Sequence, residues 1–321
     1  MIGKLKTGTS KFVLKKLLEL LLTLFVVTVI SFLLMRLSPV DPATALARRT
    51  FVIDDATRIA EFQEQMGLNK PLYVQYADWV SDAVRLEFGS SYVSGNDVFE
   101  QVMKSISITA SIVFLSAGIQ AVGILILGCL CYWKRNKITG HILNFLCIAG
   151  ISIPAFYFAS SFIDIFAVKF RFISVAGNVG IMRFLPAALC ISISGIAFYS
   201  QLLATGIESA MREDSAFYAR CRGLSEKRIL LFHALPQAIT KLLPNFMQML
   251  GLCMAGATIV ERIFSLPGLG YLIIDSVLYR DSPMIHATIL FLAFSLAIFN
   301  IISDVLQRAI QGKSEKEGGA V

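Results

Sequence analysis

Six long apolar runs divide the chain, and each is long enough to cross about 30 Å of hydrocarbon as a helix. A helix satisfies its backbone hydrogen bonds internally, whereas the strands of a membrane barrel would alternate polar and apolar residues. The runs do not alternate, so the pattern predicts an all-α membrane protein with six transmembrane helices. The runs are Leu17–Met35, Ile106–Tyr132, Ile142–Val168, Phe184–Ala204, Leu242–Val260 and Ile285–Leu306.

The long polar segment 36–105, after the first run, also carries helical signals. An aspartate at 54–55 can cap a helix that runs to Met66, and Asn96 or Asp97 can cap the helix that becomes the second span. Between them, four apolar residues at helical spacing predict an amphipathic helix with one apolar stripe: Leu72, Tyr76, Trp79 and Val80. The segment is therefore expected to form helices that pack as a cap or dock a soluble partner.

Charge gives the expected orientation. The chain is 56% hydrophobic and 16% charged, which is typical of a membrane protein, so its net charge of +7 is not read as a nucleic-acid footprint. Most of its 29 lysines and arginines lie in the two tails and the second and fourth connecting loops, which predicts that these parts are cytoplasmic. The predicted organisation is a cytoplasmic tail (1–16), a first transmembrane helix (17–35), an extracytoplasmic helical segment (36–105), a five-helix core (106–306) with a cytoplasmic loop (208–241), and a cytoplasmic tail (307–321).

The loop 208–241 is much longer than a connection between two spans requires. Its first part predicts a short helix, because Glu213 and Asp214 lie in the first turn and Arg220 in the last, where each charge suits the helix dipole. Gly223 is expected to end this helix with a positive φ.

The second part of the loop predicts another short helix, over Glu226–Leu235, capped by Ser225. Pro236 and Pro244 then bracket the entry to the fifth span. The expected shape is a helix–turn–helix on the membrane face that presents the small Ala219 and the flexible Gly223 to a partner.

Three blocks of sequence carry a family resemblance. The loop resembles the EAA loop of binding-protein-dependent ABC importer permeases, and most closely that of the dipeptide, oligopeptide and nickel family. Ser215, Gln237 and Ser282 depart from the family pattern. The residues that carry the resemblance are, in the loop, Glu213, Asp214, Ala219, Arg220, Gly223 and Leu224; after the fifth span, Glu261, Phe264, Pro267, Gly268, Gly270, Arg280, Asp281 and Pro283; and in the external segment, Gly67-Leu68-Asn69-Lys70-Pro71-Leu72 and Phe88-Gly89-Ser90-Ser91.

The resemblance implies a type I ABC importer permease in the bacterial inner membrane. It implies a homologous second permease subunit, one or two cytoplasmic ABC ATPases that bind ATP and Mg, an extracytoplasmic substrate-binding protein, and surrounding lipid. The loop would be the coupling helix that fits a cleft in the ATPase. The chain itself is expected to be non-catalytic and to hold no cofactor, because its nearest Walker-like string, Gly312-Lys313-Ser314, lacks the first glycine and a preceding strand.

Candidate metal ligands are few. His286, near the external end of the last span, and Met254, in a methionine- and cysteine-containing stretch of the fifth span, are the candidates. Methionine at helical spacing more often serves packing, so no metal site is predicted.

Two other classes compete with the importer subunit. A stand-alone secondary transporter or channel would show inverted repeats with broken helices in matching places, and an intramembrane enzyme would need paired catalytic groups inside the spans. Neither pattern is evident. The cargo stays open among a dipeptide, an oligopeptide, nickel and a metal–chelator complex.

Overall fold

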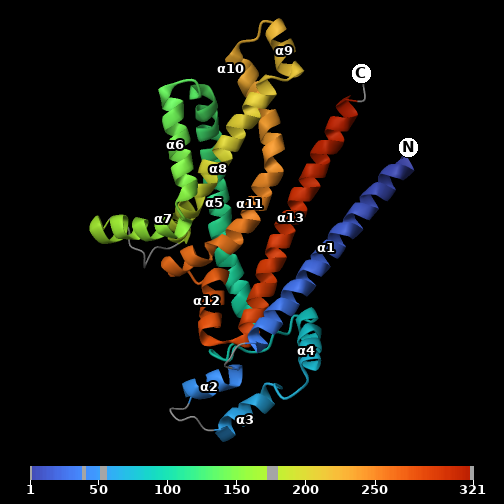
Figure 1. Ribbon diagram of the computed structural model, residues 1–321, viewed down its shortest axis with the longest axis vertical. Coiled ribbons are helices and arrows are strands. Elements are labelled where there is room, and N and C mark those ends of the chain that lie inside the picture. The colour runs from blue at the N-terminus through green and yellow to red at the C-terminus, as the bar shows by residue number, and fades with distance from the viewer. Residues whose placement is uncertain (1, 38–40, 51–55, 172–179, 319–321) are drawn as a thin grey trace. The chain divides into compact units, whose positions relative to one another are not determined.

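The computed structural model describes residues 2–37, 41–50, 56–171 and 180–318, and nearly all of them are helical (Figure 1). Among them the only β pairing is an isolated bridge between Ser90 and Asp97. The chain forms two compact units. Unit 1 is made of Met1–Thr109 and Ser265–Ala297, and unit 2 of Ala110–Phe264 and Ile298–Val321.

The described residues contain five helical segments long and apolar enough to cross a membrane, and a sixth apolar segment that is bent. This confirms the all-α membrane class and the six predicted apolar segments. The five are α1 (Ile2–Arg36), α5 (Val98–Lys134), α8 (Leu185–Met211), the continuous stretch Glu226–Ile263, and α13 (Ser282–Gly318).

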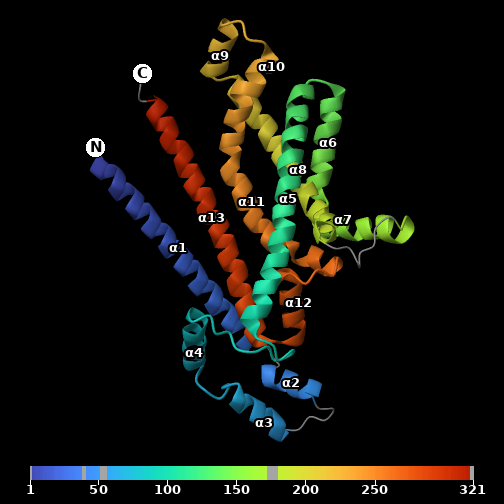
Figure 2. The same ribbon diagram turned by 180° about the vertical axis from the view of Figure 1, so that it is seen from behind.

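The third predicted span, Ile142–Val168, is a helical segment with a sharp bend. Helix α6 (Ile138–Ser152) and helix α7 (Ala155–Phe162), which continues into a π-helix (Ile163–Lys169), meet at an angle of 93°. Pro154 explains the break, because a proline excludes the preceding residue from the α region, and Ile153 is extended at φ −89° and ψ 122°. Both views show α7 turned sharply away from α6 (Figures 1 and 2).

The second loop helix, expected over Glu226–Leu235, is continuous with the fifth span. Helix α10 (Glu226–Ile229), a π-helical stretch (Leu230–Ala234) and α11 (Leu235–Ile263) follow one another without interruption. Pro236 lies in the first turn of α11, where its missing N–H and its ring are accommodated by the wider π-helical turn before it. The second loop helix therefore runs directly into the membrane segment.

The external segment of unit 1 is helical, as predicted. It contains α2 (Pro42–Thr50), α3 (Ala56–Gln65) and α4 (Leu72–Val84), while Asp54 and Asp55 lie outside the described residues. Asp97 caps α5, since its Oδ1 accepts a hydrogen bond of 2.8 Å from the amide of Glu100.

The apolar stripe of α4 is only partly as predicted. Tyr76 faces Phe32 of α1 with ring centroids 5.5 Å apart, and Trp79 packs edge-on to His286 of α13 at 5.4 Å. Leu72, however, is 52% exposed, and Gln75 occupies the buried position instead. The amide of Gln75 explains this, because its Nε2 donates to the carbonyl oxygens of residues 68 and 70 and so ties the preceding loop to the helix.

Unit 2 is organised around a buried cluster where α8 and α11 meet the short helix α9 (Asp214–Cys221) and α10. Figures 1 and 2 show α9 and α10 beyond the ends of α8 and α11. The cluster members are mostly small or aliphatic, which lets the helices approach closely. They include Leu203, Ile207, Ala216, Ala219, Ile229, Leu230 and Ala234.

Candidate functional site

The first candidate site is the α9–α10 element, defined as residues 212–234. Its turn is a Schellman motif: the amide of Leu224 donates to the carbonyl of Ala219 at 3.2 Å, and that of Gly223 to Arg220 at 2.8 Å. Gly223 has φ +78°, which confirms the expected left-handed conformation at this position. Leu224 packs against the buried cluster and so fixes the direction in which the chain leaves α9.

Helix α9 buries one face and exposes the other. Ala216 and Ala219 are buried in the cluster of unit 2, so the expectation that Ala219 is presented to a partner is wrong. A small side chain is needed at position 219 because α9 packs closely on the helices beneath it. The residues that point outward are Phe217 and Tyr218, which are 59% and 67% exposed.

Glu213 joins the start of α9 to α11. Its carboxylate accepts hydrogen bonds from Gln237 Nε2 and, at 2.9 Å, from Lys241 Nζ. The hydrogen bond from Lys241 is the largest of the effects that lower the pKa of Glu213 below its ordinary value. Gln237, one of the positions that depart from the family pattern, is thus a hydrogen-bond partner of this glutamate.

Arg220 also fixes the turn between α9 and α10. Its Nε and Nη2 donate to the two carboxylate oxygens of Glu226 at 2.7 and 3.3 Å, and its Nη1 donates to the carbonyl of Met211 at 3.1 Å. The hydrogen bond to Glu226 is the main reason that the pKa of Arg220 is raised. Arg220 therefore links the end of α8, the end of α9 and the start of α10. Asp214 lies in the first turn of α9, where its charge suits the helix dipole.

The second candidate site lies in unit 1 and joins two of the sequence blocks. Asp281 is buried, and its carboxylate accepts hydrogen bonds from Ser91 Oγ at 2.5 Å and from the amide of Tyr92 at 3.1 Å. Arg280, just before it, ends helix α12 (Leu269–Tyr279) in the left-handed conformation with φ 56°, and Pro283 lies in the first turn of α13. The pair Ser91–Asp281 lies 190 residues apart in sequence, and nothing in the sequence pattern pointed to it.

The remaining residues of the sequence block after the fifth span lie in both units. Glu261 and Phe264 are buried near the end of α11 in unit 2. In unit 1, Pro267 is exposed, while Gly268 and Gly270 are buried at the start of α12. There the amide of Leu269 donates to Thr109 Oγ1 at 2.8 Å, which ties α12 to α5.

The two metal candidates lie in different units. His286 is buried in unit 1, and both ring nitrogens face serine hydroxyls, with Nδ1 2.8 Å from Ser31 Oγ and Nε2 3.1 Å from Ser282 Oγ. Met254 is buried in α11 of unit 2. The described residues contain no group of three or more histidine, cysteine or acidic residues that could hold a metal ion.

The helices place the chain in the class of polytopic α-helical membrane proteins, with a hydrogen-bonded helix–turn–helix next to the spanning segments. Residues 124–316 match the family described as binding-protein-dependent transport system inner membrane component, and residues 9–113 match the N-terminal family of the same membrane components. The chain belongs to this family and is a permease subunit of an ABC importer, non-catalytic in itself, in the inner membrane. The family membership selects this class over a stand-alone carrier or channel and over an intramembrane enzyme.

Similar proteins include the glutathione transport system permease protein GsiC of Shigella boydii serotype 4 (strain Sb227) and that of Escherichia coli (strain K12). Each is 30% identical over 299 residues, which cover 93% of this chain and 97% of the relative. Among solved structures, the crystal structure of an amino acid ABC transporter with histidines matches with a TM-score of 0.48 and 17% identity. That match covers 68% of this chain and 94% of the other.

Proposed function

We propose that this subunit forms the translocation pathway together with a homologous permease, and that its α9–α10 element docks on a cytoplasmic ABC ATPase that binds ATP and Mg. The observation that carries the proposal is a rigid element with an outward aromatic pair. Phe217 and Tyr218 are mostly exposed, and they lie between two candidate spans, outside the apolar segments themselves.

Phe217 and Tyr218 are adjacent and both exposed, so they form an apolar patch that a partner can cover. Burying each of them would contribute about 1.5–3 kcal/mol, and aromatic residues are enriched among the side chains that dominate interface energies. The hydrogen bonds of Glu213 and Arg220 fix the α9–α10 element to α11 and α8. A movement of the bound ATPase would therefore be transmitted to the spans.

Charge supports a cytoplasmic position for this end of unit 2. Arg135 and Arg212 both pair with Glu208 at 2.8 and 2.5 Å, and the Lys227 ammonium lies 5.7 Å from the ring centroid of Trp133. Basic residues gather at cytoplasmic ends of spans. On this basis the two termini are also cytoplasmic, and α2, α3 and α4 are extracytoplasmic, where a substrate-binding protein delivers cargo.

For the cargo, a short peptide is the proposal. The relatives that cover nearly the whole chain are named for glutathione transport, and glutathione is a tripeptide. Nickel or a metal–chelator complex is the alternative that the family resemblance leaves. Uptake of labelled peptides and of nickel by the reconstituted importer separates the two.

The test of the proposal is affinity purification of the tagged chain from mild detergent, followed by mass spectrometry and an ATPase assay. A second six-span permease and one or two ATPases with Walker motifs should co-purify with ATPase activity. The double variant Phe217→Ser, Tyr218→Ser should lose the ATPases and keep the second permease. Tyr73→Ser, which changes a tyrosine 76% exposed in unit 1, is the matched control and should lose neither. A homogeneous species without ATPases would refute the proposal.

A further inference from the structure

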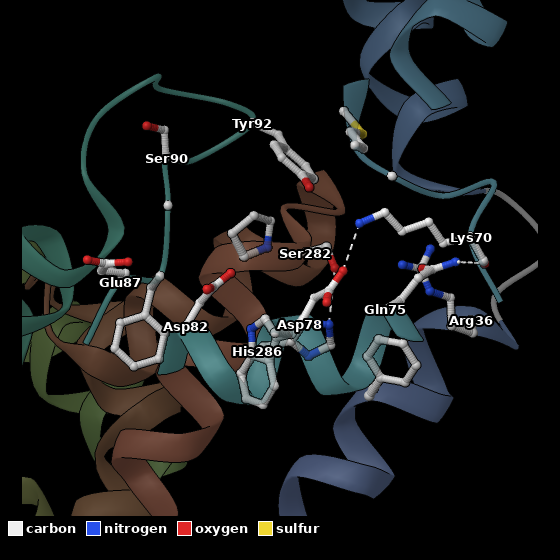
Figure 3. Close-up of a pocket in the computed structure, with 17 residues that line it drawn as sticks. Arg36, Lys70, Gln75, Asp78, Asp82, Glu87, Ser90, Tyr92, Ser282 and His286 are labelled. Atoms are coloured by element: carbon white, nitrogen blue, oxygen red, sulfur yellow. Dashed lines mark hydrogen bonds and ion pairs between the residues drawn. The ribbon is translucent and has the colours of Figure 1, made fainter. Parts of the chain in front are cut away.

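Unit 1 contains a cavity of about 490 Å³, which is within the usual size range of small-ligand sites. Figure 3 shows the side chains that line it. They come from the end of α1, the loop between α3 and α4, one face of α4, the segment 87–92 and the start of α13. By the proposed orientation this cavity lies on the extracytoplasmic side.

The inner wall of the cavity is aromatic. Phe32, Trp79 and His286 lie against one another, with ring centroids of 6.0 Å between Phe32 and His286 and 5.4 Å between Trp79 and His286. The histidine is held between Ser31 and Ser282. This wall is therefore a preformed apolar surface with a fixed shape, which lowers the ordering cost of binding.

Charges of both signs line the cavity. The Lys70 ammonium pairs with Asp78 at 2.8 Å, so these two groups satisfy each other. Arg36, whose guanidinium lies 5.3 Å from the ring centroid of Phe32, forms no ion pair with any described residue. Asp82 and Glu87 likewise have no ion-pair partner in the described parts of the chain. One cation and two carboxylates thus remain available to a ligand.

Two buried polar atoms in the lining also lack partners among the described residues. Gln75 is 9% exposed, and its Oε1 accepts no hydrogen bond, while its Nε2 is committed to the backbone carbonyls of residues 68 and 70. The indole Nε1 of Trp79 donates none. Each atom has less than 1 Å² of accessible surface, so an occupant of the cavity does not reach either of them, and the groups that face a ligand are the charged ones.

A further donor lies at the cavity edge. Burial is the main reason that the pKa of Tyr92 is raised, so its hydroxyl stays protonated at neutral pH. An occupant must therefore offer acceptors to Arg36 and Tyr92. It must also offer a positive charge to the carboxylates of Asp82 and Glu87.

We propose that this cavity is a binding site for a short peptide with free termini. The α-ammonium group pairs with the carboxylates of Asp82 and Glu87, and the terminal carboxylate accepts from the Arg36 guanidinium and the Tyr92 hydroxyl. The site deepens the proposed function, and rests on it, because it would receive peptide cargo within the permease itself before the pathway opens.

The test is direct binding to the purified importer complex in lipid nanodiscs, without the binding protein. Equilibrium dialysis compares labelled trialanine with its N-acetylated and C-amidated forms. Because each blocked terminus loses a charge-assisted hydrogen bond, each blocked form should bind about tenfold or more weakly. No substitution is needed for this comparison, so it does not depend on a variant that folds.

Variants then assign each terminus to its residue. Arg36→Gln should remove the preference for the free carboxylate over the amide and leave the preference for the free ammonium. Asp82→Asn should reduce the preference for the ammonium over the acetylated form. Arg85→Gln, which changes an exposed arginine of the same segment outside the cavity lining, is the matched control and should alter neither.

Equal binding of all three peptide forms, or an Arg36→Gln variant that keeps the carboxylate preference, would overturn the site. ATP-driven peptide uptake by the complete system with its binding protein is measured in parallel. Uptake by the wild type without terminus-dependent binding overturns only the cavity proposal. The absence of uptake, with the complex assembled, overturns the proposed peptide function instead.

Discussion

The turn at Gly223 offers a quantitative test of the coupling proposal. The residue has φ +78°, and a Cβ placed on it would meet no described atom within 4 Å. Substitution therefore adds no steric clash, and its cost is backbone strain alone. That strain is about 1–2 kcal/mol for alanine and more for a β-branched residue, whereas asparagine tolerates this conformation best among non-glycine residues.

The expected order of ATP-driven uptake is therefore wild type, Gly223→Asn, Gly223→Ala and Gly223→Val, with the valine variant close to inactive. A cost of about 1–2 kcal/mol lowers the ratio of native to non-native turn roughly five- to thirtyfold. All four proteins should reach the membrane in equal amounts, because Gly223 lies outside the candidate spans. Uptake is measured in proteoliposomes, with ATPase activity stimulated by the binding protein as the second readout.

Gly95 provides the matched control. It has φ +72° and equally open surroundings, but it lies in a turn of unit 1 before α5. Gly95→Val should carry a similar strain and still couple ATP hydrolysis to uptake. Normal uptake by Gly223→Val, or an equal loss in Gly95→Val, would refute the reasoning that the α9–α10 turn transmits the work of the ATPase.

Three further predictions follow from the described contacts. Asp281→Ala leaves the Ser91 hydroxyl and a backbone amide without their acceptor, so unfolding in nanodiscs should become easier by about 1–3 kcal/mol, seen as a lower Tm. Lys241 lowers the pKa of Glu213, so their ion pair stabilises the protein above the usual carboxyl range near pH 4, and this stabilisation is lost as the pH falls through the lowered pKa. Because the Glu213 side chain is 38% exposed, the pair contributes under about 1 kcal/mol. The difference in Tm between the wild type and Glu213→Gln should therefore vanish in acid. Cys221 is a free, exposed thiol, so a membrane-impermeant maleimide should label it in inverted vesicles and not in intact cells; labelling from outside would contradict the proposed orientation.

The sequence predicted local features well. The apolar runs, the cap at Asp97 and the left-handed Gly223 all depend on residues close together in the chain, where helix length, capping and φ preferences decide the structure. The apolar pattern alone does not decide what a proline does to a helix. Pro154 bends the third segment, whereas Pro236 stays within a continuous helical stretch, because the π-helical turn before it accommodates its ring and its missing N–H.

The candidate sites were less predictable because they depend on long-range packing. Ala219 was placed on the outer face by its small size, and it is small because it is buried. Leu72 lost its expected place to Gln75, whose amide holds a neighbouring loop. The link from Ser91 to Asp281 joins two signature blocks that no periodicity connects. In each case the deciding contact is with a partner that spacing alone does not reveal.

The most direct test of the central claim is site-specific photo-cross-linking from position 218, where the outward Tyr218 is replaced by a photoreactive phenylalanine analogue in the full chain. Irradiation of inverted membrane vesicles should give a single major adduct, and mass spectrometry should identify the partner as an ABC ATPase with a Walker motif. The same analogue at Tyr73 should give no such adduct. Adducts at position 218 with lipid alone, or with no ATPase when one co-purifies, would contradict the coupling role of the α9–α10 element.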